Sequence, residues 1–419
     1  MGFIVAESQK NKSRPIAATS MMKQIMADHF LGLDRASREG TRKIAWCTSV
    51  GPAELLHSLG FEVYFPENHG AMLGATRMAT DLIPAANAMG YSPDICSYLT
   101  ADIGAYVRGC TPLTKAYGIE KVPKADVLVY NTNQCRDVQD WFAYYAREWN
   151  VPIVGIHTHR NIQAVEDFHI GDLVSQIKIM IPTLEEVSGN KFDIDKLREV
   201  VKLSLDCTKL WRQVLECGAA VPAPLTFFDA TIHMGPAVVL RGLPQAVDYY
   251  NTLLAELKQR IDDGIAAVDA EKHRIYWDGM PIWGKLRDLS AQFNALKTNV
   301  VASTYCNSWI FDAFDPQFPL ESMAKAYTEL FIVRDDSYKE AYMEAWIKKF
   351  SIDGIIFHDA KTCPNNSNSR YMMPQRMRDR LNLPVLVVNG DLNDLRCYSE
   401  EQARTNIEAF VEQLDETGR

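Results

Sequence analysis

The chain has 419 residues, which is too long for one ordinary folding core and predicts two or three domains. Its composition, 47% hydrophobic and 23% charged, is that of an ordinary globular protein. No apolar run reaches about 18 residues, which argues against a membrane span. The net charge is −9 and the basic residues do not cluster, so nucleic-acid binding is not expected. Residues 1–15 lack the basic leader of a signal peptide, and we expect a cytoplasmic protein.

The first part of the chain predicts a helical segment at 1–40 and an α/β domain at 41–165. Residues 21–30 (MMKQIMADHF) carry the clearest helical pattern. A strand at 43–46 (KIAW) then enters a turn of small residues and proline, followed by the amphipathic stretch AELLHSLG. The segment 125–135 (ADVLVYNTNQC) has a buried-strand run that ends in a polar turn and a cysteine. A further strand is expected within 150–156 (NVPIVGI).

The second part of the chain repeats this order after a helical connector, which we place at 166–263. Strand patterns recur at 274–277 (RIYW), 353–363 (DGIIFHDAKTC) and 382–389 (NLPVLVVN), within a second α/β domain at 264–419. Buried strands that alternate with helices indicate parallel sheets covered on both faces. We therefore predict two Rossmann-like parallel-sheet domains that arose by internal duplication and are joined by a helical segment.

The cysteines are the main candidates for cofactor ligands. Ligands of open parallel sheets gather at the carboxyl ends of the strands. Cys135 and Cys363 follow such ends in the two repeats, Cys47 closes the strand 43–46, and Cys96 lies at the expected start of a helix, where a thiolate is favoured. Because the chain has no Cys-x-x-Cys pair, a structural zinc site is disfavoured. Widely separated cysteines instead suggest an iron–sulfur cluster held between domains.

The alternative for every cysteine is a small buried apolar side chain. We favour this alternative for the cysteines in amphipathic helix patterns and for those without a strand-end context: Cys207, Cys217, Cys110, Cys306 and Cys397.

Polar residues near the strand ends of the first domain are candidates for acid–base chemistry. Ser49 follows the first strand, and Glu67 and His69 form a compact acid–base pair in YFPENHGAM. His69 is equally well explained as a loop histidine with one hydrogen bond. Glu54 is better explained as a carboxylate in the first turn of a helix. For His157 and His159 (GIHTHR) we prefer a structural or substrate-lining role over a metal site.

The loop after Cys363 is rich in side-chain hydrogen-bond donors, namely Asn365, Asn366 and Asn368. Such a loop offers donors to cluster sulfurs, although turn formation alone also explains it.

The set CTSVGPAELLHSLGFEVYFPE, ICSYLTADIGA, NTNQC, DGIIFHDAKTC and LPVLVVNGDLNDLR, in this order, resembles the 2-hydroxyacyl-CoA dehydratase family over residues 40–415. This family includes the cluster-binding subunits of ATP-dependent (class I) benzoyl-CoA reductases. The segments HDAKTCPNNSNSRY and NGDLNDLR are more similar to these reductases than to the dehydratases. The resemblance implies a 4Fe–4S cluster on Cys96, Cys135 and Cys363, with Cys47 as the runner-up ligand. It also places Ser49 and Glu67 near positions that face the substrate. The dehydratases often have Cys-Asp at the second site, where this chain has Cys135-Arg136-Asp137, so the substrate subclass stays open.

The resemblance implies an iron–sulfur subunit of a class I benzoyl-CoA reductase, which adds one low-potential electron to an aromatic acyl-CoA to form a ketyl-type radical. The alternatives are a 2-hydroxyacyl-CoA dehydratase subunit, a double-cubane-type reductase, and a non-catalytic scaffold. The implied partners are the acyl-CoA substrate, a paralogous cluster-binding subunit and an ATP-hydrolysing iron–sulfur activator protein. The chain itself lacks the GxxxxGK[ST] pattern, so we expect ATP to be used by a partner.

Overall fold

The computed structural model describes residues 15–416, which contain two parallel sheets of four strands each. The strand order is β2-β1-β3-β4 in the first sheet and β6-β5-β7-β8 in the second, so both sheets have the same topology. The first sheet consists of β1 (Ile44–Cys47), β2 (Glu62–Tyr64), β3 (Val127–Asn131) and β4 (Ile153–Ile156), and the second of β5 (His273–Asp278), β6 (Thr298–Ser303), β7 (Gly354–Ala360) and β8 (Val385–Gly390). All neighbouring strands run parallel. The predicted fold class, two Rossmann-like parallel-sheet domains, is confirmed.

The central strands are buried almost throughout because helices cover both faces of each sheet. β1, β3 and β5 are buried at every residue, whereas the edge strands β4 and β8 are partly accessible. The helices of the first half are α1 (Thr19–Glu39), α2 (Ala53–Ser58), α3 (Pro66–Ala75), α4 (Ala79–Ala88), α5 (Ser97–Arg108), α6 (Leu113–Tyr117) and α7 (Asp137–Trp149). The predicted helix 21–30 lies within α1, and residues 1–14 of the expected N-terminal segment lie outside the described residues.

Helix α5 is held in place by its close packing against α4. A Cβ atom on Gly104 would lie 2.2 Å from the carbonyl oxygen of Leu82, so a side chain at this position would force the two helices apart. The residue that precedes α5 and caps it is Cys96. The tight α4–α5 contact therefore fixes the position of one predicted cluster ligand.

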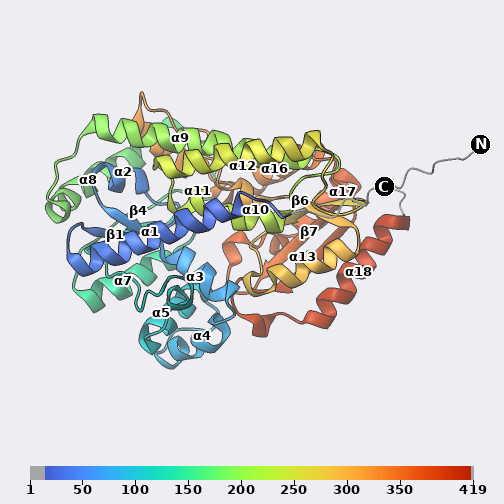
Figure 1. Cartoon of the computed structure of the whole chain (residues 1–419), viewed down its shortest axis with the longest axis horizontal. Helices are drawn as coiled ribbons and strands as arrows, with labels where there is room; N and C mark the ends of the chain where they lie inside the picture. The colour runs from blue at the N-terminus through green and yellow to red at the C-terminus, as the bar shows by residue number, and fades with distance from the viewer. Residues whose placement is uncertain (1–14, 417–419) are drawn as a thin grey trace, which may run out of the picture.

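The helical connector spans both halves of the molecule. It contains α8 (Asp167–Ser188), α9 (Ile194–Glu216), α10 (Phe227–His233), α11 (Gly235–Val239) and α12 (Pro244–Asp262). Figure 1 shows α9 and α12 side by side along one edge, next to the first half in blue and the second half in orange and red. One hydrophobic core contains residues of both sheets and of the connector. Because this core is shared, it does not mark where one domain ends and the next begins. The domain boundaries at residues 40, 165 and 263 are a proposal.

The loops at the carboxyl ends of the two sheets face each other. The second half adds α13 (Leu286–Ala295), α14 (Thr304–Asn307), α15 (Pro319–Thr328), α16 (Asp336–Lys349), α17 (Met373–Leu381) and α18 (Glu400–Glu416). The amide N–H of Ser97 donates to Thr362 Oγ1 at 3.1 Å, and Asn393 Nδ2 donates to the Gly70 carbonyl at 2.8 Å. The strand ends that hold ligands in such folds are thus brought together at one interface. Within residues 15–416, no helix is long and apolar enough to cross a membrane.

Candidate functional site

The three cysteines predicted as cluster ligands converge at the interface between the two halves. Cys96 caps α5, Cys135 lies just before α7, and Cys363 precedes a short 3₁₀ turn at Pro364–Asn366. The backbone N–H of Cys96 donates to Asp137 Oδ2 at 3.0 Å, which joins the starts of α5 and α7. Burial raises the pKa of the Cys96 thiol well above its ordinary value, and the nearby Cys135 and Cys363 raise it further. The three half-buried cysteines therefore have neighbouring thiols.

A backbone N–H donor three residues further along the chain lies near each of the three sulfurs and lowers the pKa of that thiol. These donors are Leu99 for Cys96, Val138 for Cys135 and Asn366 for Cys363. Such bonds favour the thiolate over the thiol, although burial still raises the pKa of Cys135 to about 12. Thiolates with backbone donors are suited to iron–sulfur ligation, in which hydrogen bonds to sulfur tune the cluster.

The three thiols as they are placed do not form a site for a single metal ion. Among residues 15–416, no group of three or more His, Cys, Asp or Glu residues is placed to hold one ion. A four-iron cluster spreads its thiolates around a larger inorganic body, so its ligands lie farther apart than the ligands of one ion. The chemistry of three thiols with backbone donors is consistent with such a body.

Arg160 connects the two loops that carry Cys135 and Cys363. Its guanidinium donates to the carbonyl of Gln134 at 3.1 Å and to Asn365 Oδ1 at 3.1 Å. Arg160 was not predicted as a site residue, although His157 and His159 in the same segment were candidates. His157 bonds to the Tyr130 hydroxyl and His159 to Asp172, and neither lines the cavity described next.

A cavity of about 290 Å³ lies beside the cysteines, between α1, α3, the α10–α11 segment and loops of the second half. Ser49 and Glu67, both predicted from the sequence, line it. Gln134, which precedes Cys135, and Asn366, whose backbone N–H donates to the Cys363 carbonyl, also line it. The cavity is therefore lined both by Glu67, the predicted proton-transfer residue, and by the loops that carry Cys135 and Cys363.

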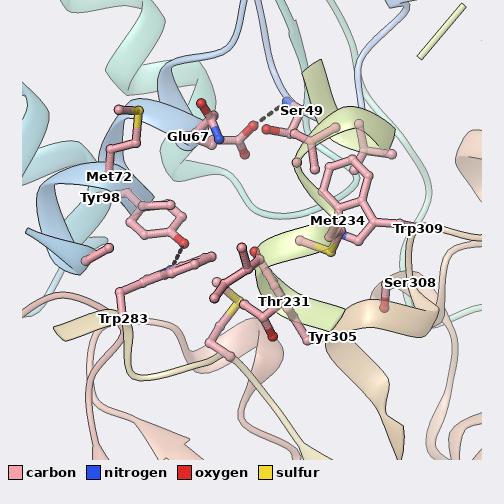
Figure 2. Close-up of a pocket in the computed structure, with 18 of the residues that line it drawn as sticks. Ser49, Glu67, Met72, Tyr98, Thr231, Met234, Trp283, Tyr305, Ser308 and Trp309 are labelled. Carbon is pink, nitrogen blue, oxygen red and sulfur yellow. Dashed lines mark hydrogen bonds between the residues drawn. The ribbon is translucent and has the colours of Figure 1, made fainter. Parts of the chain in front are cut away.

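Glu67 carries a buried carboxyl group in the first turn of α3. Its Oε2 accepts a hydrogen bond from the backbone N–H of Ser49, drawn as a dashed line in Figure 2. Burial raises the pKa of Glu67 above its ordinary value, and the hydrogen bonds from the Ser49 amide and hydroxyl offset only part of this effect. The environment thus shifts the equilibrium of Glu67 towards the neutral carboxylic acid, which is a proton donor.

Two tyrosines on the opposite side of the cavity from Ser49 were missed by the sequence analysis. The indole N–H of Trp283 donates to the Tyr98 hydroxyl, which in turn interacts with that of Tyr305 (Figure 2). Burial raises the pKa of both tyrosines, so both hydroxyls stay protonated. The sequence did offer one indication that Tyr98 belongs to the site, because it follows Cys96 by two residues. Trp283 and Tyr305 reach the cavity only through the packing of the two halves, which the sequence does not reveal.

His69, also predicted as a catalytic residue, lies in a separate buried network. Its Nδ1 lies 2.6 Å from Asp102 Oδ1, and its Nε2 lies 2.9 Å from Thr111 Oγ1. Asp102 also accepts hydrogen bonds from Trp141 Nε1 at 3.0 Å and from the Tyr145 hydroxyl at 2.6 Å. His69 does not line the cavity. This network connects α3, α5 and α7, the helices whose starts carry Glu67, Cys96 and Cys135.

Cys47, the runner-up ligand, lies beneath the turn that follows β1. It is fully buried and does not line the cavity, and a Cβ atom on Gly51 would lie 2.7 Å from its sulfur. The same turn is held by Arg241, whose guanidinium donates to the carbonyls of Ser49 and Gly51 at 3.2 Å each. Arg241 also forms a buried ion pair with Glu54 at 2.7 Å, so Glu54 does more than favour the start of α2.

The remaining asparagines and cysteines occupy structural positions. Asn368 donates to the buried carboxylate of Asp278 at 3.0 Å. Among the cysteines that we expected to be structural, three are buried and two are half-buried: Cys207, Cys217 and Cys306, and Cys110 and Cys397.

Two Rossmann-like domains that enclose cysteines and an apolar cavity between their strand ends define an α/β protein with an interdomain site. A profile of the 2-hydroxyglutaryl-CoA dehydratase D-component family matches residues 48–414, and the chain belongs to this family.

Three curated relatives match nearly the whole chain. The (R)-2-hydroxyisocaproyl-CoA dehydratase alpha subunit of Clostridioides difficile is 28% identical over 98% of both chains. The (R)-phenyllactyl-CoA dehydratase alpha subunit of Clostridium sporogenes is 28% identical over 90% of both chains. A benzoyl-CoA reductase subunit of Thauera aromatica is 26% identical over 98% of both chains.

Proposed function

We propose that the chain is the cluster-carrying subunit of an enzyme that performs one-electron chemistry on the acyl group of a CoA thioester. The observation that carries the proposal is the convergence of Cys96, Cys135 and Cys363, each with a backbone N–H group near its sulfur, beside the cavity lined by Glu67. When bound, a 4Fe–4S cluster supplies electron transfer at low potential. The names of the relatives, which are all CoA-thioester enzymes, support an acyl-CoA substrate.

The side chains of the cavity have complementary tasks in such chemistry. A thioester carbonyl that accepts an electron develops negative charge on its oxygen, and the protonated hydroxyls of Tyr98 and Tyr305 are neutral donors for that charge. Glu67, in its neutral form, holds a proton at its carboxyl group next to Ser49. The buried walls exclude water, which protects a radical and strengthens these electrostatic interactions.

Two reactions use this same set of groups. In the first, an aromatic acyl-CoA is reduced through a ketyl-type radical, which the similarity to a benzoyl-CoA reductase subunit supports. In the second, a 2-hydroxyacyl-CoA loses water and the electron is recovered afterwards, which the similarity to two dehydratase alpha subunits supports. Both reactions need an electron, a proton donor and a stabilised carbonyl oxygen.

The proposal includes protein partners. Each of the three relatives is named as one subunit of its enzyme, so we propose that a paralogous subunit pairs with this chain. The sequence lacks a P-loop pattern, so we do not assign ATP hydrolysis to this chain. We propose that a separate ATP-hydrolysing iron–sulfur protein delivers the electron.

Anaerobic purification followed by iron and sulfide analysis tests the cluster. We expect Cys135→Ala and Cys363→Ala to lose iron, because no neighbouring thiol replaces the missing ligand. Cys207→Ala, which removes a buried thiol from α9, is the matched control and should keep its iron. Full iron occupancy in both ligand variants, with an unchanged electron paramagnetic resonance spectrum of the reduced protein, would refute the assignment.

A second assay separates the two reactions. The air-free protein, with the subunits that copurify with it, is supplied with a reduced activator, ATP and either benzoyl-CoA or a 2-hydroxyacyl-CoA. Consumption of electrons in proportion to product indicates the reductase, whereas turnover with catalytic amounts of electrons indicates the dehydratase.

A further inference from the structure

The walls of the cavity away from Glu67 consist mainly of carbon and sulfur. Trp283 and Met72 lie on the side of Tyr98, and Met234 and Trp309 lie across the cavity from them (Figure 2). Five methionines line the cavity in total. Methionine is unbranched and adapts to ligands of different shape, and its sulfur packs favourably against aromatic rings. Such walls are suited to an apolar group.

The described residues that line the cavity offer no buried positive charge to a ligand. Among the described lining residues, the charged side chains are Lys23 and Glu67. Lys23 lies on the exposed side of α1, where its ammonium group stays in water, whereas Glu67 is buried. A carboxylate placed inside would have to lose its hydration without an ion-pair partner, and it would lie near the carboxyl group of Glu67. Burial of an unpaired charge is strongly unfavourable.

The size of the cavity matches an acyl group and not a whole thioester. Its volume of about 290 Å³ lies at the small end of the range for ligand pockets, about 300–1,000 Å³. The nucleotide part of coenzyme A is too large and too charged for these walls. The acyl chain is therefore the part of the substrate that the cavity encloses.

We propose that this cavity selects CoA thioesters with an uncharged, apolar acyl group, such as an aromatic ring or a branched alkyl chain, and rejects acyl groups that end in a second carboxylate. The inference rests on the proposed function, because it assumes that an acyl-CoA is the ligand. It separates this chain from a 2-hydroxyglutaryl-CoA enzyme, after which the family is named.

Equilibrium binding of three thioesters to the air-free protein, isolated with its copurifying subunits, tests the inference. Glutaryl-CoA and 5-methylhexanoyl-CoA have nearly the same shape, because a carboxylate in the first replaces an isopropyl group in the second. Benzoyl-CoA supplies an aromatic ring. We expect glutaryl-CoA to bind about tenfold or more weakly than the other two, because its carboxylate is desolvated without a partner.

Three variants sharpen the result. Met234→Arg places a cation in the apolar wall and should shift the binding ratio about tenfold towards glutaryl-CoA, whereas the volume-matched Met234→Leu should leave the ratio unchanged. Lys23→Ala should also leave it unchanged, because Lys23 is exposed to water. The melting temperature of each variant shows whether it is folded, and the thioester comparison on the unmodified protein decides the question if a variant is not.

The possible failures are distinguishable. Glutaryl-CoA binding as tight as that of 5-methylhexanoyl-CoA overturns this inference and leaves the proposed function standing. A selective loss of glutaryl-CoA binding in Lys23→Ala also overturns it, because Lys23 would then pair with the carboxylate. If none of the three thioesters binds, the proposed function fails and this inference fails with it.

Discussion

At the residue scale, the protonation of Glu67 has a direct consequence for the dependence of activity on pH. Burial raises the pKa of Glu67 above its ordinary 4.5, and the polar groups that interact with its carboxyl group include Ser49, Tyr305 and the thiols of Cys47 and Cys135. Activity that uses the neutral acid should be present below this raised pKa and be lost as the pH rises through it. Glu67→Gln keeps a similar shape and an acceptor for the Ser49 amide, but it has no transferable proton.

We therefore expect Glu67→Gln to lower kcat by about 10²–10⁴-fold, with little change in acyl-CoA affinity, and to abolish that alkaline limb of the pH profile. Air-free steady-state kinetics across the pH range measure both effects. Glu62→Gln, in a surface ion pair with Arg42, is the control and should resemble the unmodified protein. A fully active Glu67→Gln variant would exclude Glu67 as the proton donor.

Sequence position alone explains why some residues of the site were predicted and others were not. The cysteine contexts repeat in both halves and end at strand termini, so Cys135 and Cys363 could be singled out from the sequence. His69 was grouped with Glu67 because they are two residues apart. On a helix that spacing places two side chains on different sides, and His69 accordingly points to Asp102 while Glu67 faces the cavity. Tyr305 comes from the other half of the chain, and no local sequence pattern indicates that it lies next to Tyr98.

At the element scale, the turn between β1 and α2 depends on a buried ion pair with the helical connector. Glu54 Oε1 accepts hydrogen bonds from Arg241 at 2.7 Å and from Ser204 at 2.8 Å, and Tyr327 donates to its other oxygen. Burial alone would raise the pKa of Glu54, but the Arg241 guanidinium and these hydrogen bonds hold it below its ordinary value. The pair therefore contributes stability above about pH 4.5, which is lost as the pH falls through the lowered pKa.

Arg241→Met should lower the free energy of unfolding by about 3–5 kcal/mol, because it leaves the carboxylate of Glu54 buried without a partner. Urea denaturation at neutral pH measures this loss. The double variant Glu54→Gln with Arg241→Met should lose less than the sum of the two single variants. Arg212→Met, which breaks an ion pair with Asp312 at the surface, should change the stability by no more than about 1 kcal/mol. A loss as small in Arg241→Met would contradict the role of the pair.

The elements themselves were predictable where a repeat supported them. Strands β1, β3, β4, β5, β7 and β8 lie in or next to the predicted segments, because each has a run of β-branched or aromatic residues in a repeated order. Strand β6 (Thr298–Ser303) was not predicted, since half of the residues in its sequence TNVVAS are polar. Its burial depends on its pairing with β5 and on the helices that cover it, which the sequence does not reveal.

At the scale of the whole molecule, the site exists only where the two halves meet, and one buried carboxylate connects them. Asp391, which is inaccessible to solvent, accepts hydrogen bonds from Ser97 Oγ at 2.5 Å and from Thr362 Oγ1 at 2.6 Å. It also accepts the backbone N–H of Thr362 at 2.8 Å. Ser97 follows Cys96 and Thr362 precedes Cys363, so Asp391 sets the distance between two predicted ligands from different halves.

Asp391→Ala should weaken the retention of iron about 10- to 100-fold, which is the usual effect of removing a residue that orients metal ligands. The variant leaves the hydrogen-bond donors of Ser97 and Thr362 without their acceptor. The loops that carry Cys96 and Cys363 are then no longer linked through Asp391, although all three cysteines remain. Release of iron to a chelator from the air-free protein measures the effect, and the melting temperature shows that the variant is folded. Asp379→Ala removes an exposed carboxylate from α17 and should retain iron normally. Normal iron retention in folded Asp391→Ala would mean that the ligands are held without this link, by the packing of the two halves alone.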